Sequence, residues 1–118
     1  MIFEFKTSGK TVDIDNEDNF DKLKGDELSE LLYEDPNYIR WMTSKHIKKF
    51  SGSEIGLTLL KNPDLFDYFA INIGKVSEAN LVKLAKEHPS LLEKIKYVNV
   101  GAYILATHET ELTLAVVN

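Results

Sequence analysis

Apolar and polar side chains alternate in two short segments at the start of the chain, which is the period of a half-buried β-strand. The segments cover residues 1–6 and 11–15, and their apolar positions are Phe3, Phe5, Val12 and Ile14. The polar stretch between them contains a glycine, which is typical of a hairpin loop. The pattern predicts an N-terminal β-hairpin that packs on later residues, because an isolated hairpin is only marginally stable in water.

A longer pattern occurs three times after residue 28. Each copy has a short amphipathic stretch, a polar residue, a proline, and apolar residues two, three and six positions beyond the proline. The prolines, Pro36, Pro63 and Pro89, are 27 and 26 residues apart. A proline ends the preceding helix and is favoured at the first position of the next one. Each copy therefore predicts a short helix, a tight corner and a second short helix, and this period is typical of stacked helical repeats.

The end of the chain repeats the pattern in part. The segment 98–101, with the sequence Val-Asn-Val-Gly, follows the similar segment 71–74 at a distance of 27 residues. We therefore interpret residues 97–118 as the helical start of a fourth copy. The alternation of Leu112 and Leu114 with polar neighbours leaves a β-hairpin open as the alternative.

These patterns predict an α+β, mainly α fold in one domain of 118 residues, a length that suits a single core. A β-hairpin covers residues 1–15, an acidic connector covers 16–27, and stacked short helix pairs cover 28–118. The apolar positions of both patterns are expected to form the core: Phe3, Phe5, Leu28, Leu31, Leu32, Ile39, Met42, Leu59, Phe66, Phe69, Leu81, Leu84, Leu92, Ile95 and Leu112.

Two resemblances bear on function. The leucine and proline pattern of residues 28–117 resembles short α-helical repeats of the leucine-rich-variant type, which implies an interaction scaffold and brings no catalytic residues with it. The segment 20–41, with Phe-Asp-Lys-Leu-Lys-Gly followed by Asp-Pro-Asn-Tyr-Ile-Arg-Trp, resembles the small accessory module of phage and exonuclease-X-type proteins. That second resemblance implies a role in association with nucleic acid, although Asp21 stands where the module has glycine.

Composition narrows the classes of function. The chain has no cysteine, which excludes disulfides, cysteine-ligated metals and thiol catalysis. No apolar run approaches the roughly 18 residues that span a bilayer, so we expect a cytoplasmic protein without a membrane partner. Lysine outnumbers arginine thirteen to one. This usage is typical of AT-rich genomes, including those of phages, and such a protein would act in the host cytoplasm.

The clearest charge feature is an acidic segment. Residues 13–35 hold ten carboxylates against two lysines. A calcium loop does not fit, because Asp18 and Lys24 stand where the sixth position needs glycine and the twelfth needs glutamate. The carboxylates either solvate a loop and helix start or form an acidic face for a basic partner. The candidate partner-binding residues are Asp13, Asp15, Glu17, Asp18 and Asp21.

The opposite charge follows directly, on a helix predicted to run from Pro36 to Phe50. Aromatic side chains beside lysines can stack on and hold single-stranded nucleic acid, although solvated lysines around a packed aromatic ring are the simpler interpretation. The residues of this alternative site are Tyr38, Arg40, Trp41, Lys45, Lys48 and Lys49.

Catalytic and metal-binding signatures are absent from the sequence. His46, His88 and His108 lack the spacing of a metal site, and no nucleophile or phosphate-loop motif occurs. We therefore expect no enzyme, no cofactor and no metal. The sequence favours a non-catalytic protein-interaction domain, such as a phage or mobile-element accessory factor that binds and inhibits or modulates a host protein through its acidic face. The alternative is a nucleic-acid-binding accessory module that uses the aromatic and basic residues.

Overall fold

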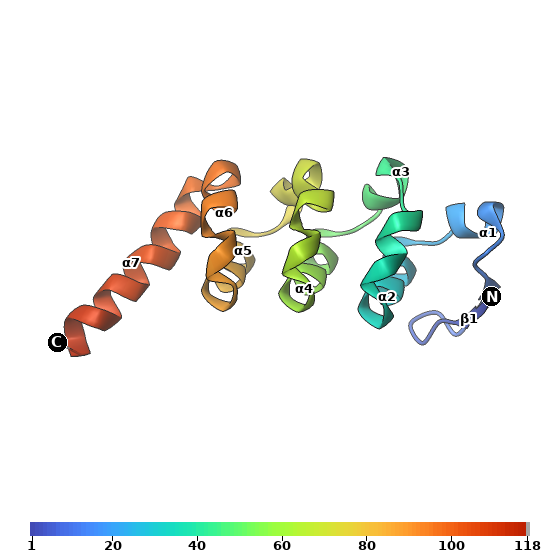
Figure 1. Cartoon of the computed structure of the whole chain (residues 1–118), viewed down its shortest axis with the longest axis horizontal. Coiled ribbons are helices and arrows are strands. Elements are labelled where there is room, and N and C mark those ends of the chain that lie inside the picture. The colour runs from blue at the N-terminus through green and yellow to red at the C-terminus, as the bar shows by residue number, and fades with distance from the viewer. Residues whose placement is uncertain (118) are drawn as a thin grey trace.

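The chain forms an elongated stack that measures 57 × 24 × 19 Å along its principal axes. The computed structural model describes the backbone of residues 1–117 and the side chains of residues 1–108. A small hairpin lies at one end, helix pairs follow one another along the long axis, and a single long helix lies at the other end (Figure 1). The predicted α+β, mainly α class with stacked helix pairs is confirmed.

The hairpin consists of β1 (Ile2–Glu4) and β2 (Thr11–Asp13), which pair antiparallel with Phe3 opposite Val12. The strands are shorter than the alternating segments that predict them. Gly9 has φ +71° in the loop, a left-handed conformation that glycine adopts without steric cost. Phe5, just beyond β1, is fully buried and anchors the hairpin on the helices.

The predicted acidic connector is itself partly helical. It contains α1 (Glu17–Asp21) and the first three residues of α2 (Gly25–Glu34). The side chain of Asn16 accepts a hydrogen bond from the backbone N–H of Asn19 at 3.1 Å, which caps α1. Two carboxylates in the first turn of α1 favour the helix through its dipole, so part of the acidic character has a local structural cause.

Three helix pairs follow, and their order matches the repeat. The first is α2 with the 3-10 helix η1 (Pro36–Trp41) and α3 (Ser44–Ile47); the second is α4 (Gly52–Lys61) with η2 (Pro63–Lys75). The third is α5 (Glu78–Glu87) with η3 (Pro89–Leu91) and α6 (Leu92–Val98). Pro36, Pro63 and Pro89 each begin the element after the corner, as predicted.

The prediction of one helix from Pro36 to Phe50 is wrong. The backbone is extended at Met42 (ψ 135°) and Thr43 (ψ 178°), which separates η1 from α3. Thr43 starts a new helix because its backbone N–H donates to Nδ1 of His46 at 2.9 Å. That local contact replaces the continuous helix that the apolar spacing alone favours.

Long polar side chains close the seams between repeats. Lys49 donates to the backbone oxygens of Asp21 (2.6 Å) and Leu23 (2.8 Å), and Lys75 does the same one repeat later at Lys48 and Phe50. The lysines thus satisfy carbonyl groups that the connections between repeats leave unpaired. A similar pair of contacts joins the helix ends: Lys61 donates to the oxygen of Tyr33, and Nε2 of His88 donates to that of Leu60 at 2.7 Å.

The C-terminal element is the helix α7 (Val100–Val117). The helical interpretation of residues 97–118 is therefore confirmed as far as residue 117, and the hairpin alternative is wrong. A fourth helix pair does not form within this range, because α7 runs on without a corner and leaves the stack at an angle (Figure 1). Ala102 and Ala106 are buried where α7 packs on α5 and α6.

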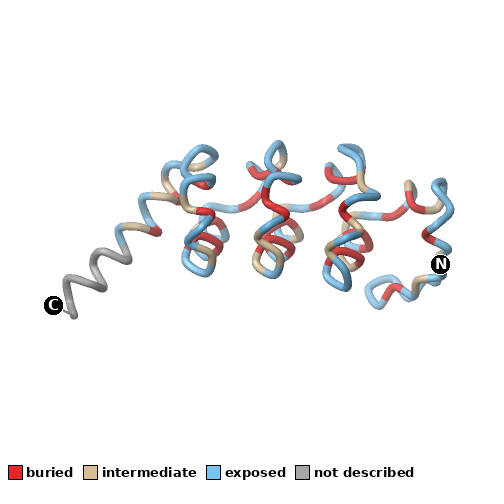
Figure 2. Tube along the Cα trace, in the orientation of Figure 1, coloured by how far each residue is buried: buried red, intermediate tan, exposed pale blue. Residues whose placement is uncertain are grey.

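One core runs through the stack, on the sides of the helices that face neighbouring repeats (Figure 2). Most of the expected core positions are buried; Phe3, Met42 and Leu92 are only partly so, and the side chain of Leu112 lies outside the described residues. The core also takes in residues that the expected list did not include: Ile14, Phe20, Leu23, Ile47, Phe50, Ile55, Leu65, Ile73, Val76, Ala85, Leu91, Ala102 and Ala106. Of these, Ile14 belongs to the predicted hairpin pattern, and Leu65 and Leu91 stand two positions beyond a repeat proline.

Candidate partner-binding surface

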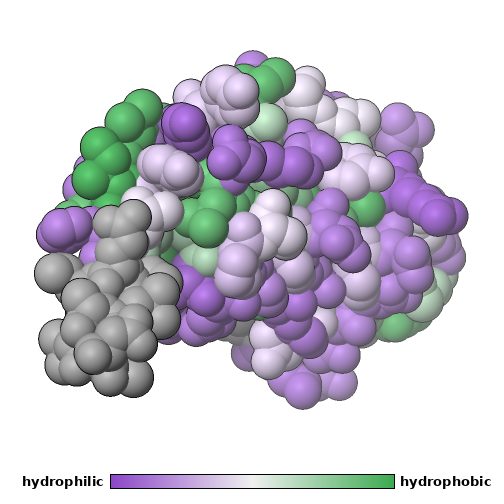
Figure 3. Space-filling model, turned by 60° about the vertical axis from the view of Figure 1, so that its left-hand side comes forward, coloured by the Kyte–Doolittle hydropathy of each residue, from purple (hydrophilic) through white to green (hydrophobic). Residues whose placement is uncertain are grey.

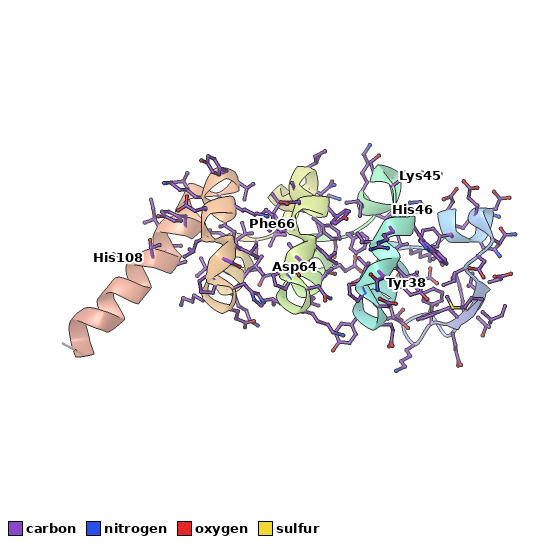
Figure 4. The ribbon with its side chains drawn as sticks, in the orientation of Figure 1. Tyr38, Lys45, His46, Asp64, Phe66 and His108 are labelled. Carbon is purple, nitrogen blue, oxygen red and sulfur yellow. The ribbon has the colours of Figure 1, made fainter. Side chains whose placement is uncertain are left out.

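The acidic and the aromatic–basic candidates meet at the N-terminal end of the stack. Asp21, the last residue of α1, pairs with Nζ of Lys45 at 3.0 Å through one carboxylate oxygen. Its other oxygen lies 2.8 Å from Nε2 of His46. Because these contacts span 24 and 25 residues, the sequence pattern did not reveal them. Figure 4 shows Tyr38, Lys45 and His46 on the side of the first helix pair that faces the N-terminal elements.

The contacts of Asp21 change the pKa of its carboxyl group. The hydrogen bonds from Lys45 and then from His46 hold the pKa of the Asp21 carboxyl below its usual range. A carboxyl with a depressed pKa stabilises the fold above the pKa of the unfolded chain, and this contribution is lost as the pH falls through the folded value.

The substitution Asp21→Asn should therefore lower stability at neutral pH, and the difference should disappear only when the pH falls below the usual carboxyl range and the wild-type carboxyl of the folded protein becomes protonated. Urea unfolding of both proteins at pH 7 and pH 2 measures the difference. Asp18→Asn, at an exposed carboxylate of the same helix, is the control. An equal difference at both pH values would contradict the ion-pair role of Asp21.

An aromatic cluster lies beside this ion pair. The ring of Phe20 packs against His46 (centroids 4.9 Å apart) and against Trp41 (5.9 Å), and Tyr38 meets Trp41 edge to face at 5.3 Å. Burial, with Asp35 and Asp15 nearby, raises the pKa of the Tyr38 hydroxyl. Trp41 remains 43 % exposed, so one part of its indole is available to a partner.

The ion pair and part of the aromatic cluster line a cleft of about 380 Å³, which we call the N-terminal cleft. Its walls are Ile14, Asp15, Glu17, Phe20 and Asp21 from the acidic segment and Trp41, Thr43, Lys45 and His46 from the first helix pair. The other candidates, which do not line the cleft, are Asp13, Asp18, Tyr38, Arg40, Lys48 and Lys49. Asp13 instead contacts the N-terminal amino group, as Asp15 also does, and Lys49 is committed to the repeat seam.

Asp21, His46 and Thr43 place a carboxylate, an imidazole and a hydroxyl in the same succession as a catalytic triad. The imidazole cannot, however, activate this hydroxyl as a nucleophile. The hydroxyl of Thr43 lies 3.1 Å from Nδ1 of His46, whose other nitrogen faces Asp21. However, the Thr43 backbone N–H already donates to Nδ1, so that nitrogen has no lone pair left to activate the hydroxyl. The ring proton therefore resides on Nε2 and donates to Asp21, and His46 joins α3 to α1.

Two further features, a metal site and a membrane span, concern the part of the chain that the structure describes. Within that part, no three histidine or acidic side chains are placed to hold a metal ion. None of the described helices combines the length and apolar composition of a membrane span.

A second apolar surface lies at the opposite end of the stack (Figure 3). Tyr97, Val100 and Ile104 are exposed there, and none of them is among the expected core positions. A sequence signal for this surface exists in the i, i+4 spacing of Val100 and Ile104 on one helix face.

Comparison with known proteins gives no information on the function of the chain, because no family, no curated protein and no solved structure matches it.

Proposed function

We propose that this chain is a non-catalytic protein-binding module whose N-terminal cleft receives a basic segment of a partner protein. The observation that carries the proposal is that two exposed carboxylates and the exposed part of Trp41 line one cleft: Glu17, and Asp15, which also contacts the N-terminal amino group. Carboxylates attract lysine and arginine, and an indole face adds a cation–π contact to the same side chains. The stacked helices form the rigid support that such a surface needs.

The nucleic-acid alternative has weaker support. Lys45 is paired with Asp21, and Lys49 donates to two backbone carbonyls, so neither side chain is free to meet a phosphate without losing a contact. The carboxylates of α1 also lie beside these lysines, where they would repel a phosphate backbone. We retain nucleic-acid binding as the outcome that would replace our proposal.

A phage or mobile-element accessory factor that modulates a host protein is the setting that we propose for the module. The lysine-rich composition, with a single arginine, supports it. Bacterial host lysate is accordingly the source in which to search for the partner.

Reversing one charge of the cleft should weaken partner capture. Glu17→Lys replaces an attraction with a repulsion at an exposed position, and we expect roughly fivefold lower affinity from one rim charge. Immobilised wild-type and variant proteins are compared by affinity capture from lysate with quantitative mass spectrometry. A specific partner is a protein whose recovery falls with Glu17→Lys and with increasing salt.

The matched control is Glu93→Lys. Glu93 is likewise an exposed glutamate in the first turn of a helix, but it lies in α6, outside the cleft. Recovery of the same proteins in equal amounts by all three baits would remove the cleft from consideration.

The single tryptophan distinguishes the two candidate functions. Trp41 lines the cleft, so its fluorescence should change when a basic peptide derived from the captured partner binds. Titration with single-stranded oligonucleotide should leave it unchanged. Salt-dependent quenching by micromolar oligonucleotide would instead support the nucleic-acid alternative.

A further inference from the structure

A groove of about 450 Å³ separates α2 from α4 and shares no lining residue with the N-terminal cleft. We call it the α2–α4 groove. Its apolar surface comes from Tyr33, which is 60 % exposed, and Leu57, which is 64 % exposed. The hairpin loop closes one side through Lys6 and Thr7. Large side chains of this kind at neighbouring positions are typical of a docking surface when a charged rim surrounds them.

The charge around this groove is predominantly negative. Four carboxylates line it, those of Asp26, Glu30, Glu34 and Glu54. They face the lining residue Lys6 and also Lys61, whose Nζ lies 3.4 Å from the centroid of the Tyr33 ring. The excess of carboxylates favours a partner with positive charge.

Part of the groove is held in place before any partner arrives. The backbone N–H groups of Lys6 and Thr7 and the Thr7 hydroxyl donate to the Glu30 carboxylate at 2.8–3.0 Å. Burial opposes ionisation of Glu30, but these hydrogen bonds outweigh it and the pKa lies below its usual range. Glu54 accepts a hydrogen bond from the Ser51 N–H at 2.8 Å. Fixed carboxylates lower the entropic cost of binding.

The repeat shows how one position of the groove changes along the stack. Glu30, Leu57 and Lys83 occupy the same position in three successive repeats. The charge at this position therefore changes from negative on α2 to positive on α5. The net charge of −5 disfavours a second copy of the chain as the occupant, because two molecules of like net charge repel one another as they approach.

We propose that the α2–α4 groove docks a basic amphipathic segment of a partner protein. One large apolar side chain of that segment covers Tyr33 and Leu57, and its lysine or arginine side chains lie against Glu34, Asp26 and Glu54. The inference rests on the proposed protein-binding function and adds a second contact surface to it.

The test uses a synthetic amphipathic peptide of lysine and leucine, titrated into the ¹⁵N-labelled full chain and followed by NMR. Amide shifts should concentrate in α2 and α4. Two control peptides replace every leucine with serine or every lysine with glutamate, and both should bind at least tenfold more weakly.

Two pairs of variants separate docking from general charge attraction. Leu57→Ser should weaken binding about tenfold, because it removes an apolar contact of ordinary leucine size. Ile71→Ser, at a residue 95 % exposed outside the groove, should leave binding unchanged. Glu34→Lys should weaken binding severalfold, whereas Glu87→Lys, at the corresponding last position of α5, should not.

The experiments give different results if the α2–α4 groove proposal fails and if the N-terminal cleft proposal fails. Shifts confined to Asp15, Glu17 and Trp41 would overturn the α2–α4 groove and support the N-terminal cleft. Equal binding of the lysine–serine peptide, or equal effects of Leu57→Ser and Ile71→Ser, would overturn the groove because no apolar side chain is being recognised. Absence of any binding by the lysine–leucine peptide would also overturn the groove, without bearing on the partner captured through the cleft.

Discussion

Replacing Phe69 with alanine should lower the free energy of unfolding by about 3–5 kcal/mol. Phe69 is fully buried in η2, and its ring meets that of Phe50 edge to face with centroids 4.9 Å apart. Phe50 lies at the end of the first helix pair, so the cavity would weaken the contact between two repeats. A loss of this size is comparable with most of the stability of a small domain. Urea unfolding followed by circular dichroism measures it.

The control is the neighbouring Tyr68→Ala. Tyr68 lies on the same 3-10 helix but is 56 % exposed, so its loss should change stability by less than about 1 kcal/mol. Equal unfolding midpoints for the two variants would show that Phe69 does not occupy the core.

Adding a single methyl group at Gly52 should destabilise the stack by about 1–3 kcal/mol. A Cβ atom at this first residue of α4 would lie 2.0 Å from the backbone oxygen of Lys75. Backbone atoms cannot rotate away as a side chain can, so the seam between α4 and the end of η2 must open. Gly25 stands in the same relation to the oxygen of Lys49, at 2.2 Å, and Gly25→Ala should have a similar effect.

Gly74→Ala is the matched control for this prediction. Apart from the adjoining residues of its own segment, no atom lies within 4 Å of a Cβ built at Gly74, and neither Gly52 nor Gly74 has a positive φ. Thermal unfolding should show a lower midpoint for Gly52→Ala and an unchanged or slightly higher one for Gly74→Ala. A midpoint for Gly52→Ala equal to that of the wild type would show that the seam is not close-packed.

Much of the fold follows from local constraints that a sequence shows directly. A proline limits its own backbone and that of the residue before it, so Pro36, Pro63 and Pro89 locate three corners without reference to the rest of the chain. The spacing of leucine and phenylalanine then identifies the faces that neighbouring repeats bury.

The errors arise where a few local hydrogen bonds compete with that spacing. The continuous helix expected after Pro36 is interrupted at Thr43, where the His46 side chain accepts the backbone N–H. The acidic connector, for which the sequence left a helix start open, contains α1, and Asn16 caps that helix. Both signals are present in the sequence, but each is weak beside the apolar pattern.

The sequence predicted single residues of the candidate site, but not how they lie relative to one another. The sequence identified carboxylates around Asp15 and Glu17 and an aromatic residue at Trp41, but it showed no relation between them. Their assembly into one cleft depends on Asp21 meeting Lys45 and His46, more than twenty residues further along the chain. The sequence also treated Lys49 as a free cation, whereas in the structure its ammonium group donates to two backbone carbonyls.

The amino-acid sequence by itself determined the hairpin, the proline corners, the repeat and the faces that become the core, because these depend on backbone restrictions and side-chain periodicity over one or two turns. Only the tertiary structure decided which charges neutralise one another, which lysines close the seams and which apolar side chains, such as Tyr33 and Leu57, remain exposed together. Those outcomes depend on distances between repeats about 27 residues apart, and a linear pattern of residues does not contain such distances.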